Sequence, residues 1–382
     1  MMQNTKTKII AALSGGVDSS VAASIYTKKG FEVIGVTLKM KSCDDTKEKT
    51  KSCCGLDDNI QAGLVAEKLG ISHYFLDVRK DFKEKILKYA WDEYYIGRTP
   101  NPCVLCNYFL KFGALLDFAK DIGAVGVITG HYAILRHDNK SNNVKLFKGY
   151  DDNKNQTYFL SALTQEQLNH SHMPLGELTK TEVRQIAAKL DLPNAKKQES
   201  QDACFGYKGE TFAETLSRTF NTHSIAGDIV TEDGKIVGKH NGIHNFTIGQ
   251  RKGLGVALGK PAYVVKIDSK SNIVTISTDS SLLLADRFEA INMNWLDFSY
   301  DRLECEVQTR YRQSPIKAIV TKINESQVDV KLLVPSRAIT PGQALAVYKG
   351  EQLIAGGRID AVIRNYKRSF VESPVYNNIN NV

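Results

Sequence analysis

The sequence predicts an α/β protein: a parallel sheet covered by helices, then a small β-rich central domain, then a C-terminal antiparallel β-barrel. Its 382 residues allow two or three separately folding units. Up to about Pro193, short apolar runs alternate with segments of helical period, which is typical of a parallel sheet. After about Gly209, strand-like runs follow one another and the helical signal largely disappears. We therefore place domains at residues 1–209, 210–280 and 281–368, with a flexible tail at 369–382.

The apolar pattern predicts the elements of the first domain. Short strands are expected at residues 9–13, 32–38, 73–78 and 125–129. An amphipathic helix is indicated by apolar residues at positions i, i+3, i+4 and i+7, namely Ala62, Val65, Ala66 and Leu69, and Gly70 ends it. A second helix is expected to begin at Thr179, which has capping-box spacing to Glu182, and to end before Pro193.

The later part of the chain reads as antiparallel β-structure. Strict polar–apolar alternation at 303–307 and 328–332 predicts half-buried strands of a small barrel or sandwich. Cys305 falls on the apolar face of the first of these strands and is expected in the core. The glycine-containing string 250–255 predicts a hairpin tip, and Arg310 and Tyr311 are expected on an alternating strand.

Composition excludes several classes of protein. Hydrophobic residues at 42% and charged residues at 24% are ordinary for a globular chain. No apolar run approaches the roughly 18 to 20 residues of a membrane span, so we expect no membrane partner. Seven cysteines without an export signal favour the reducing cytoplasm over a disulfide framework. A net charge of +8 permits a polyanionic partner without requiring one.

The most informative string is Ser14-Gly15-Gly16-Val17-Asp18-Ser19-Ser20, which lies between the first strand and a helix. Glycines allow a close backbone approach, and the N-terminus of the helix offers N–H groups to a phosphate. Asp18 is a candidate Mg²⁺ ligand. Neither a Walker loop nor a dinucleotide turn has this spacing. The string resembles the pyrophosphate-binding loop of adenylating ATP pyrophosphatases, which have an adenine-nucleotide alpha-hydrolase-like (PP-loop) sheet.

Three cysteines are candidates for the chemistry that follows adenylation. Cys103 and Cys106 lie in a proline-rich segment, and the two prolines are expected to prevent regular helix until Cys106 or later. Cys106 would then be near a helix N-terminus, where the dipole lowers the pKa of a thiol. Cys204 lies in a polar loop beyond the last helix of the α/β domain. Cys43, Cys53 and Cys54 have no predicted role.

Across essentially its whole length the chain resembles the tRNA-specific 2-thiouridylases, which place sulfur at C2 of the wobble uridine of certain tRNAs. The motifs that carry the resemblance are the 14–20 loop, Asn101-Pro102-x-x-Cys106-Asn107, Gly130-His131-Tyr132, Gln156-x-Tyr158-Phe159-Leu160, Cys204-Phe205, Thr247-Ile248-Gly249-Gln250-Arg251-Lys252-Gly253 and Arg310-Tyr311-Arg312. An unrelated sequence would very rarely contain all of these motifs in this order by chance.

The resemblance implies a role for each matching residue. The ATP site would be lined by Ala12, Leu13, Ser14, Gly15, Gly16, Val17, Asp18, Ser19, Leu38 and Gly130. The target base would be contacted by Asn101, Pro102 and Cys103, and the rest of the tRNA by His131, Lys154, Asn155, Gln156, Arg310, Tyr311 and Gln343. Cys106 corresponds to the nucleophile, and Cys204 to the residue that receives sulfur as a persulfide from a sulfur relay protein or a cysteine desulfurase. The implied substrate region is the anticodon stem-loop.

Two positions depart from the family pattern. Many members have Asp where this chain has Cys103, and Lys-Asp-Gln where it has Lys154-Asn155-Gln156. The first departure leaves two hypotheses open. Cys103 could replace the aspartate as a proton acceptor in a persulfide mechanism, or it could ligate an iron–sulfur cluster with Cys106 and Cys204. A zinc site would require a fourth ligand.

Two rival functions are also consistent with parts of the sequence. An adenylating ligase or amidotransferase for a small molecule would share the loop and turn over without RNA. A tRNA-binding module with a vestigial nucleotide pocket would not cleave ATP to AMP and pyrophosphate.

Overall fold

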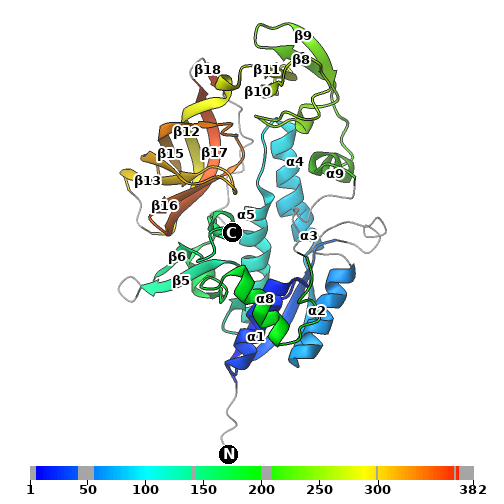
Figure 1. Cartoon of the computed structure of the whole chain (residues 1–382), viewed down its shortest axis with the longest axis vertical. Coiled ribbons are helices and arrows are strands. Elements are labelled where there is room, and N and C mark those ends of the chain that lie inside the picture. Colours follow the sequence, from blue (N-terminus) through cyan, green and yellow to red (C-terminus); the bar gives the residue numbers. More distant parts are fainter. Residues whose placement is uncertain are drawn as a thin grey trace, which may run out of the picture. The chain divides into compact units, whose positions relative to one another are not determined.

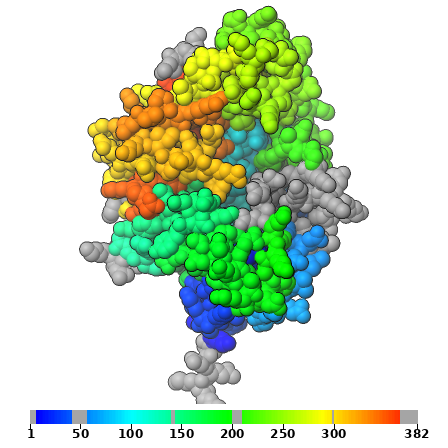
Figure 2. Space-filling view, viewed as in Figure 1, coloured from blue at the N-terminus to red at the C-terminus, as the bar shows by residue number. Residues whose placement is uncertain are grey.

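The computed structural model describes residues 6–41, 56–138, 143–198, 209–297, 300–364 and 367–369. The chain divides into two compact units, shown as ribbons in Figure 1 and as space-filling surfaces in Figure 2. Unit 1 consists of residues 1–86, 103–212 and 351–353, and unit 2 of residues 87–102, 213–350 and 354–382. Each unit is therefore assembled from separate stretches of sequence.

Unit 1 contains a five-stranded parallel sheet in the order β3-β2-β1-β4-β7. Its strands are β1 (Lys8–Ala12), β2 (Glu32–Lys39), β3 (Ser72–Asp77), β4 (Val127–Ile128) and β7 (Ser171–His172). The helices α1 (Val17–Lys28), α2 (Leu56–Leu69) and α8 (Lys180–Lys189) share one apolar core with this sheet. The remaining short helices of this part are α3 (Arg79–Asp81), η2 (Phe82–Leu87), η4 (Thr157–Leu160) and α7 (Gln165–Asn169).

Most local predictions for this unit are confirmed. Each of the four expected strands is present, although β4 is only two residues long. α2 ends before Gly70, whose φ of +64° is in the left-handed region that favours glycine at a helix C-terminus. The capping box at α8 is formed: the hydroxyl of Thr179 accepts from the N–H of Glu182, and the carboxylate of Glu182 accepts from the N–H of Thr179.

A long helix and a hairpin complete unit 1. The helical segments α5 (Pro102–Cys106), η3 (Asn107–Ala114) and α6 (Leu115–Asp121) follow one another directly, with a π-helical middle. Within the described residues, Pro102–Asp121 is the one helix long and apolar enough to cross a membrane, but half of it is buried inside the protein, as in the core helix of a globular domain. β5 (Ala133–Asp138) and β6 (Asn143–Lys148) form the antiparallel hairpin.

Unit 2 contains a small sheet and a closed barrel, in agreement with the predicted fold class. The small sheet has the order β10-β11-β8-β9, with β8 (Gly227–Thr231), β9 (Ile236–His240), β10 (Tyr263–Asp268) and β11 (Ile273–Ser277). The barrel order is β12-β15-β14-β13-β16-β17, and it closes because β12 also pairs with β17. The barrel strands are β12 (Leu284–Trp295), β13 (Arg302–Gln308), β14 (Ile316–Asn324), β15 (Gln327–Arg337), β16 (Ala344–Lys349) and β17 (Gln352–Arg364), and β18 (Lys367–Ser369) pairs with β17.

The short helices α4 (Lys88–Tyr95), α9 (Phe212–Thr219), η5 (Ile243–Asn245) and η6 (Ser280–Leu283) belong to or adjoin the β-rich region. Two local expectations for this part were wrong. Residues 250–255 are not a hairpin tip, because they lie in the long connection between β9 and β10. Arg310 and Tyr311 lie in the turn after β13 rather than on a strand. Cys305 packs against the barrel core as expected, although it is only partly buried.

Candidate active site

The predicted phosphate loop lies where the order of the parallel sheet reverses. β2 and β3 extend the sheet on one side of β1, and β4 and β7 extend it on the other. Ser14, Gly15 and Gly16 follow the carboxyl end of β1 and lead into α1. Open α/β sheets bind ligands in the crevice at this kind of switch point. The topology therefore supports a ligand site at the loop.

The loop is held by its own hydroxyl groups. The Ser19 hydroxyl donates to the carbonyl of Gly16 at 3.0 Å and accepts from the N–H of Ser14 at 3.3 Å. The Ser20 hydroxyl donates to the same Gly16 carbonyl at 2.9 Å. Gly15 has a φ of +69°, and a Cβ there would lie 2.2 Å from the backbone oxygen of Asp58. Only glycine fits this position without moving the backbone of α2.

Asp18, the candidate Mg²⁺ ligand, contacts two residues that the sequence did not single out for this site. Its Oδ1 accepts from Lys180 Nζ at 2.6 Å and from the Tyr132 hydroxyl at 2.8 Å. Lys180 is the first residue of α8, and Tyr132 comes just after β4. Both contacts join segments more than a hundred residues apart in sequence. The ammonium of Lys180 therefore neutralises the carboxylate at the start of α1.

A second pair of residues clamps the loop from the segment after α8. The Asn194 side-chain amide donates to the Gly15 carbonyl at 3.1 Å and to the Ser20 hydroxyl at 2.9 Å. Lys197 Nζ donates to the same carbonyl at 3.1 Å and forms an ion pair with Asp58. Sequence reasoning missed Lys180, Asn194 and Lys197. Their only sequence signal is their position around the helix that precedes the Cys204 loop.

Gly130 fixes the spacing between the end of β4 and the start of α1. A Cβ on Gly130 would lie 2.7 Å from the Ser19 nitrogen and 2.8 Å from the Asp18 carbonyl carbon. The other residues expected in the nucleotide site lie around the same edge: Leu13 and Val17 are buried, Ala12 ends β1, and Leu38 is buried near the end of β2. Unit 1 therefore brings the expected ATP-site residues to one edge of the sheet.

We expect Gly130→Ala to impair nucleotide cleavage strongly while the protein still folds. The added methyl must push back the first turn of α1, because its neighbours are backbone atoms that cannot rotate away. A displacement of about 1 Å in a catalytic constellation reduces rates by about 100-fold. ATP cleavage to AMP and pyrophosphate measures the effect. Gly63→Ala is the matched control for solubility, since Gly63 lies within α2 and a Cβ there would make only an ordinary contact, 4.0 Å from His73 Nδ1.

The cysteine helix begins earlier than the prolines suggested. Helix α5 starts at Pro102, so Cys103 is in its first turn and Cys106 is one turn further along. Proline is well tolerated at the first position of a helix, because its fixed φ suits the helix and its missing N–H would have no partner there. The expectation that Cys106 marks the helix N-terminus was therefore wrong.

Burial, not the helix dipole, dominates the electrostatics of both thiols. Desolvation raises the pKa of Cys103 to about 11, with the nearby Cys106 adding to the shift and Lys111 opposing it. Desolvation also raises the pKa of the buried Cys106 thiol, and Lys111 again offsets part of the effect. The expectation that the helix lowers the pKa of Cys106 and favours its thiolate was therefore wrong. Because both pKa values are raised, Cys103 and Cys106 are neutral thiols at pH 7.

Several residues expected to contact RNA are engaged inside unit 1. His131 is buried, its Nδ1 is 2.9 Å from the Thr129 hydroxyl, and its ring packs against Phe112. Desolvation lowers the pKa of His131 well below the usual value. The side-chain amide oxygen of Asn155 accepts from the Thr157 hydroxyl, and the side-chain amide oxygen of Gln156 accepts from the Tyr132 N–H. Lys154 precedes them in the same turn and is partly exposed. Asn155 and Gln156 therefore help to position Tyr132 and the 155–160 turn.

Unit 2 holds Asn101 and Pro102, two of the three residues expected to contact the target base. The Gln343 amide donates to the carbonyls of Thr99 and Pro100, at 3.0 and 3.1 Å. Asn101 is partly exposed, and Pro102 is buried. Gln343 thus supports this segment through its backbone. Arg310 is exposed and Tyr311 is half-buried in the turn after β13.

Cys204, Cys43, Cys53 and Cys54 lie outside the described residues. Among the residues that are described, no group of three or more His, Cys, Asp or Glu side chains is arranged to hold a metal ion.

Three family models match successive parts of the chain. A tRNA methyl transferase HUP domain matches residues 7–208. A tRNA methyl transferase PRC-barrel domain matches residues 214–278, and an aminomethyltransferase beta-barrel domain matches residues 285–359. Together these models span most of the sequence.

Curated relatives align over nearly the whole chain. The tRNA-specific 2-thiouridylase MnmA of Heliobacterium modesticaldum is 40% identical, covering 93% of this chain and 92% of that protein. The proteins of the same name from Pelotomaculum thermopropionicum and Rickettsia felis are each 41% identical and cover 93% of this chain, with 98% and 97% of their own lengths. A solved 4-thiouridine synthetase–RNA complex with bound ATP is 17% identical, with a TM-score of 0.34, and covers 56% of this chain and 50% of that chain.

Proposed function

The chain belongs to the tRNA-specific 2-thiouridylase family, and from this premise we propose that it uses ATP to place sulfur at C2 of the wobble uridine of tRNA. The observation that carries the proposal is the 40% identity to a 2-thiouridylase over 93% of this chain. The loop of Ser14–Gly16 at the switch point of the sheet supports it, because this geometry suits a phosphate ligand.

In the proposed first step, O2 of the uridine attacks the α-phosphate of ATP, pyrophosphate leaves, and an O2-adenylate forms. Residues 12–19, Leu38 and Gly130 would line the ATP site. Lys180 and Lys197 lie beside the loop and would supply positive charge near the departing pyrophosphate. A Mg²⁺ bound with ATP would neutralise phosphate charge. Asp18 fits this role through Oδ2, because Oδ1 already accepts two hydrogen bonds.

In the proposed second step, the terminal sulfur of a persulfide on Cys204 attacks C2, and AMP leaves with the former O2 oxygen. Cys106 then attacks the inner sulfur, which releases the 2-thio group and leaves a Cys106–Cys204 disulfide. A reductant must reopen the disulfide, and a sulfur relay protein or cysteine desulfurase must reload Cys204. The alternative proposal is that Cys103, Cys106 and Cys204 together would ligate an iron–sulfur cluster that carries the sulfur.

The proposed tRNA contacts are made through the anticodon stem-loop. The uridine would be extruded from the loop, at a cost of a few kcal/mol, and held by Asn101, Pro102 and Cys103. His131, Lys154, Asn155, Gln156, Arg310, Tyr311 and Gln343 are proposed around the rest of the RNA. The reducing cytoplasm is the proposed compartment, because the mechanism needs free thiols.

The decisive experiment is a nucleoside digest of bulk tRNA from cells with and without the protein. We expect the 2-thiouridine nucleosides to disappear when the protein is removed and to return when it is restored. Unchanged 2-thiouridine would refute the proposal. Purified protein separates the rivals: a small-molecule ligase would release AMP and pyrophosphate without RNA, and a binding module would not cleave ATP.

The buried thiol also predicts a pH dependence. Because burial raises the pKa of Cys106, only a small fraction is thiolate at pH 7, and that fraction grows about tenfold per pH unit below the pKa. Under single-turnover conditions with persulfidated protein, we therefore expect release of thiolated tRNA to accelerate continuously from pH 7 to pH 9. A plateau at or below pH 7.5 would show that the thiolate already forms at neutral pH.

A further inference from the structure

Unit 2 has a concave pocket lined by three arginines from three different segments. Its volume is about 390 Å³, and it is lined by Ile248, Gly249, Arg251, Tyr263, Arg310, Arg337 and Ala338. All three arginine side chains are exposed, and none forms an ion pair with a carboxylate in the part of the chain that the structure describes. Three permanently charged guanidinium groups that share a pocket without a counter-ion repel one another. A bound anion would relieve this repulsion.

Arg337 is held over an aromatic ring. Its guanidinium carbon lies 4.4 Å from the centroid of the Tyr263 ring, a cation–π contact. The following residue, Ala338, has a φ of +55°, which is uncommon for a residue with a side chain. Backbone strain of this kind concentrates at functional sites. The chain thus turns sharply just after it presents Arg337 to the pocket.

Arg310 is tied to the same strand end by a hydrogen-bonded bridge. Gln313, in the Arg310 turn, donates from Nε2 to the Ser336 hydroxyl at 2.8 Å and accepts from the Thr309 hydroxyl at 2.7 Å. Ser336 and Thr309 are both buried. The Gln313 N–H also donates to the Arg310 carbonyl, at 3.2 Å. This bridge fixes the turn carrying Arg310 against the residue that precedes Arg337.

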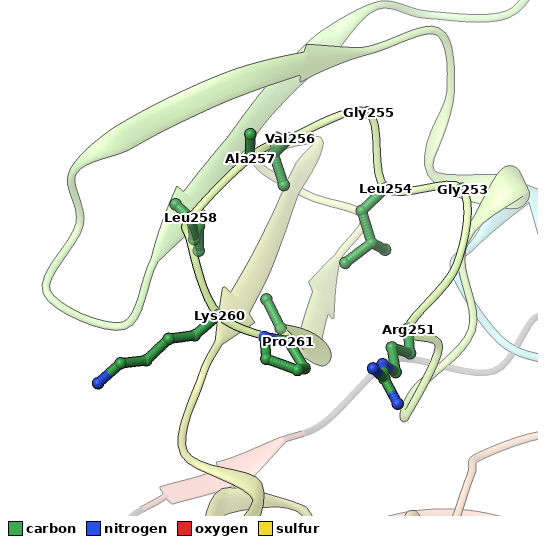
Figure 3. A pocket seen from close by; sticks show the side chains of 10 residues that line it. Arg251, Gly253, Leu254, Gly255, Val256, Ala257, Leu258, Lys260 and Pro261 are labelled. Atoms are coloured by element: carbon green, nitrogen blue, oxygen red, sulfur yellow. The ribbon is translucent and has the colours of Figure 1, made fainter.

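Arg251 comes from a compact loop on the central domain. The N–H of Gly249 donates to the backbone carbonyl of Val264 at 2.8 Å, and the N–H of Val264 donates to the backbone carbonyl of Gln250 at 3.0 Å. These two bonds fix the turn before Arg251 beside Tyr263. Residues 251–262 then curl into a ring in which Leu254 points inward and Lys260 points outward (Figure 3). Leu254 and Ala262 are buried in the same apolar core as Ile229 and Val264 of the small sheet, so this core anchors the loop. The pocket is therefore preorganised from all three sides.

We infer that the pocket of Arg251, Arg310 and Arg337 binds one backbone phosphate of the RNA substrate, with Arg337 and Tyr263 as its fixed wall. This inference rests on the proposed function. A guanidinium matches a phosphate through two parallel N–H donors, and converging arginines suit one anion better than scattered lysines do. The pocket adds Arg337 and Tyr263 to the proposed RNA contacts, and Gln313 as a positioning residue.

The test measures binding of an unmodified tRNA transcript to the full-length protein over a salt series. We expect Arg337→Ala and Arg310→Ala each to weaken binding about tenfold at low salt and to reduce the slope of log K against log salt, by about 0.7 to 0.9 for one lost phosphate contact. The double variant should lose much less than the product of the single losses, because both residues hold the same phosphate. Arg302→Ala is the control, since Arg302 is exposed on β13 outside the pocket.

A variant that changes no charge tests whether Gln313 positions Arg310. Gln313→Ala keeps all three arginines, so it should weaken tRNA binding several-fold without removing a charge from the pocket. Adding Arg310→Ala to Gln313→Ala should then weaken binding by a smaller factor than Arg310→Ala does in the wild-type protein. Wild-type affinity and salt slope in both Arg310→Ala and Arg337→Ala, or losses equal to those of Arg302→Ala, would overturn the inference. A wild-type protein that binds tRNA in this way but does not thiolate it would instead refute the proposed function.

Discussion

Cys106→Ser lowers the rate of tRNA thiolation at least about 1,000-fold, while ATP cleavage in the presence of tRNA continues. The reason is that a serine hydroxyl is far too weak a nucleophile at neutral pH to open a persulfide, whereas it does not disturb the loop at the end of β1. Cys106 is buried, and serine is nearly the same size, so the helix that carries it should be retained. The measurements are 2-thiouridine formed per protein in a single turnover and AMP released in the same reaction.

Cys103 supplies the matched comparison on the same helix. Cys103→Asp introduces the residue that many family members have. We expect this variant to keep substantial thiolation activity if Cys103 acts only as a proton acceptor or by contact with the base. A Cys103→Asp variant as inactive as Cys106→Ser would contradict that role and favour a ligand role for both thiols. Thiolation by Cys106→Ser at the wild-type rate would remove Cys106 from the mechanism.

Arg98→Met destabilises unit 2 by about 3–5 kcal/mol, the usual effect of removing one partner of a buried ion pair. The Arg98 side chain is fully buried; its Nε is 2.8 Å from Glu93 Oε2, and its Nη1 is 2.8 Å from Asp360 Oδ1. Its Nη2 also donates to the Ile359 carbonyl at 3.0 Å. Without Arg98, the buried Glu93 carboxylate keeps only Arg358, at 2.6 Å, as an ion-pair partner among the described residues.

Tryptophan fluorescence during urea unfolding measures this loss selectively. The chain has two tryptophans, and both Trp91 and Trp295 belong to unit 2. Arg302→Met is the control, because it removes an exposed arginine of the same unit. We expect Glu93→Met combined with Arg98→Met to recover part of the loss, since an apolar pair leaves no unpaired charge at that contact. An unfolding midpoint for Arg98→Met equal to that of the control would contradict the prediction.

The phosphate loop was predictable from sequence because its signal is local. The direction of the loop is determined by a strand, a glycine turn and the beginning of a helix, which follow one another within about a dozen residues. The structure places these elements as expected. The residues that hold the loop were not predictable, because tertiary packing brings Lys180 and Lys197 to it from positions 162 and 182 residues away along the chain. No spacing rule joins them to Asp18 or Gly15.

The errors in the cysteine segment have a different cause. Two prolines suggested an extended segment, but Pro102 occupies the first position of the helix, where its ring favours the helical φ. The pKa expectation then failed because burial of both thiols outweighs the helix dipole, an effect that depends on surrounding side chains. In unit 2, short helices such as α9 were missed because apolar periodicity over eight residues is a weak signal beside many strands.

The discontinuous composition of unit 2 affects how the protein is made. Residues 87–102, including α4 and Arg98, leave the ribosome well before their partners Pro341 and Asp360. At about 5–20 residues per second, this early segment waits tens of seconds with Trp91 and a charged arginine lacking their native surroundings. Unit 2 therefore completes its fold only near the end of synthesis, and a chain cut before β17 would leave Glu93 without Arg358 and Arg98 without Asp360.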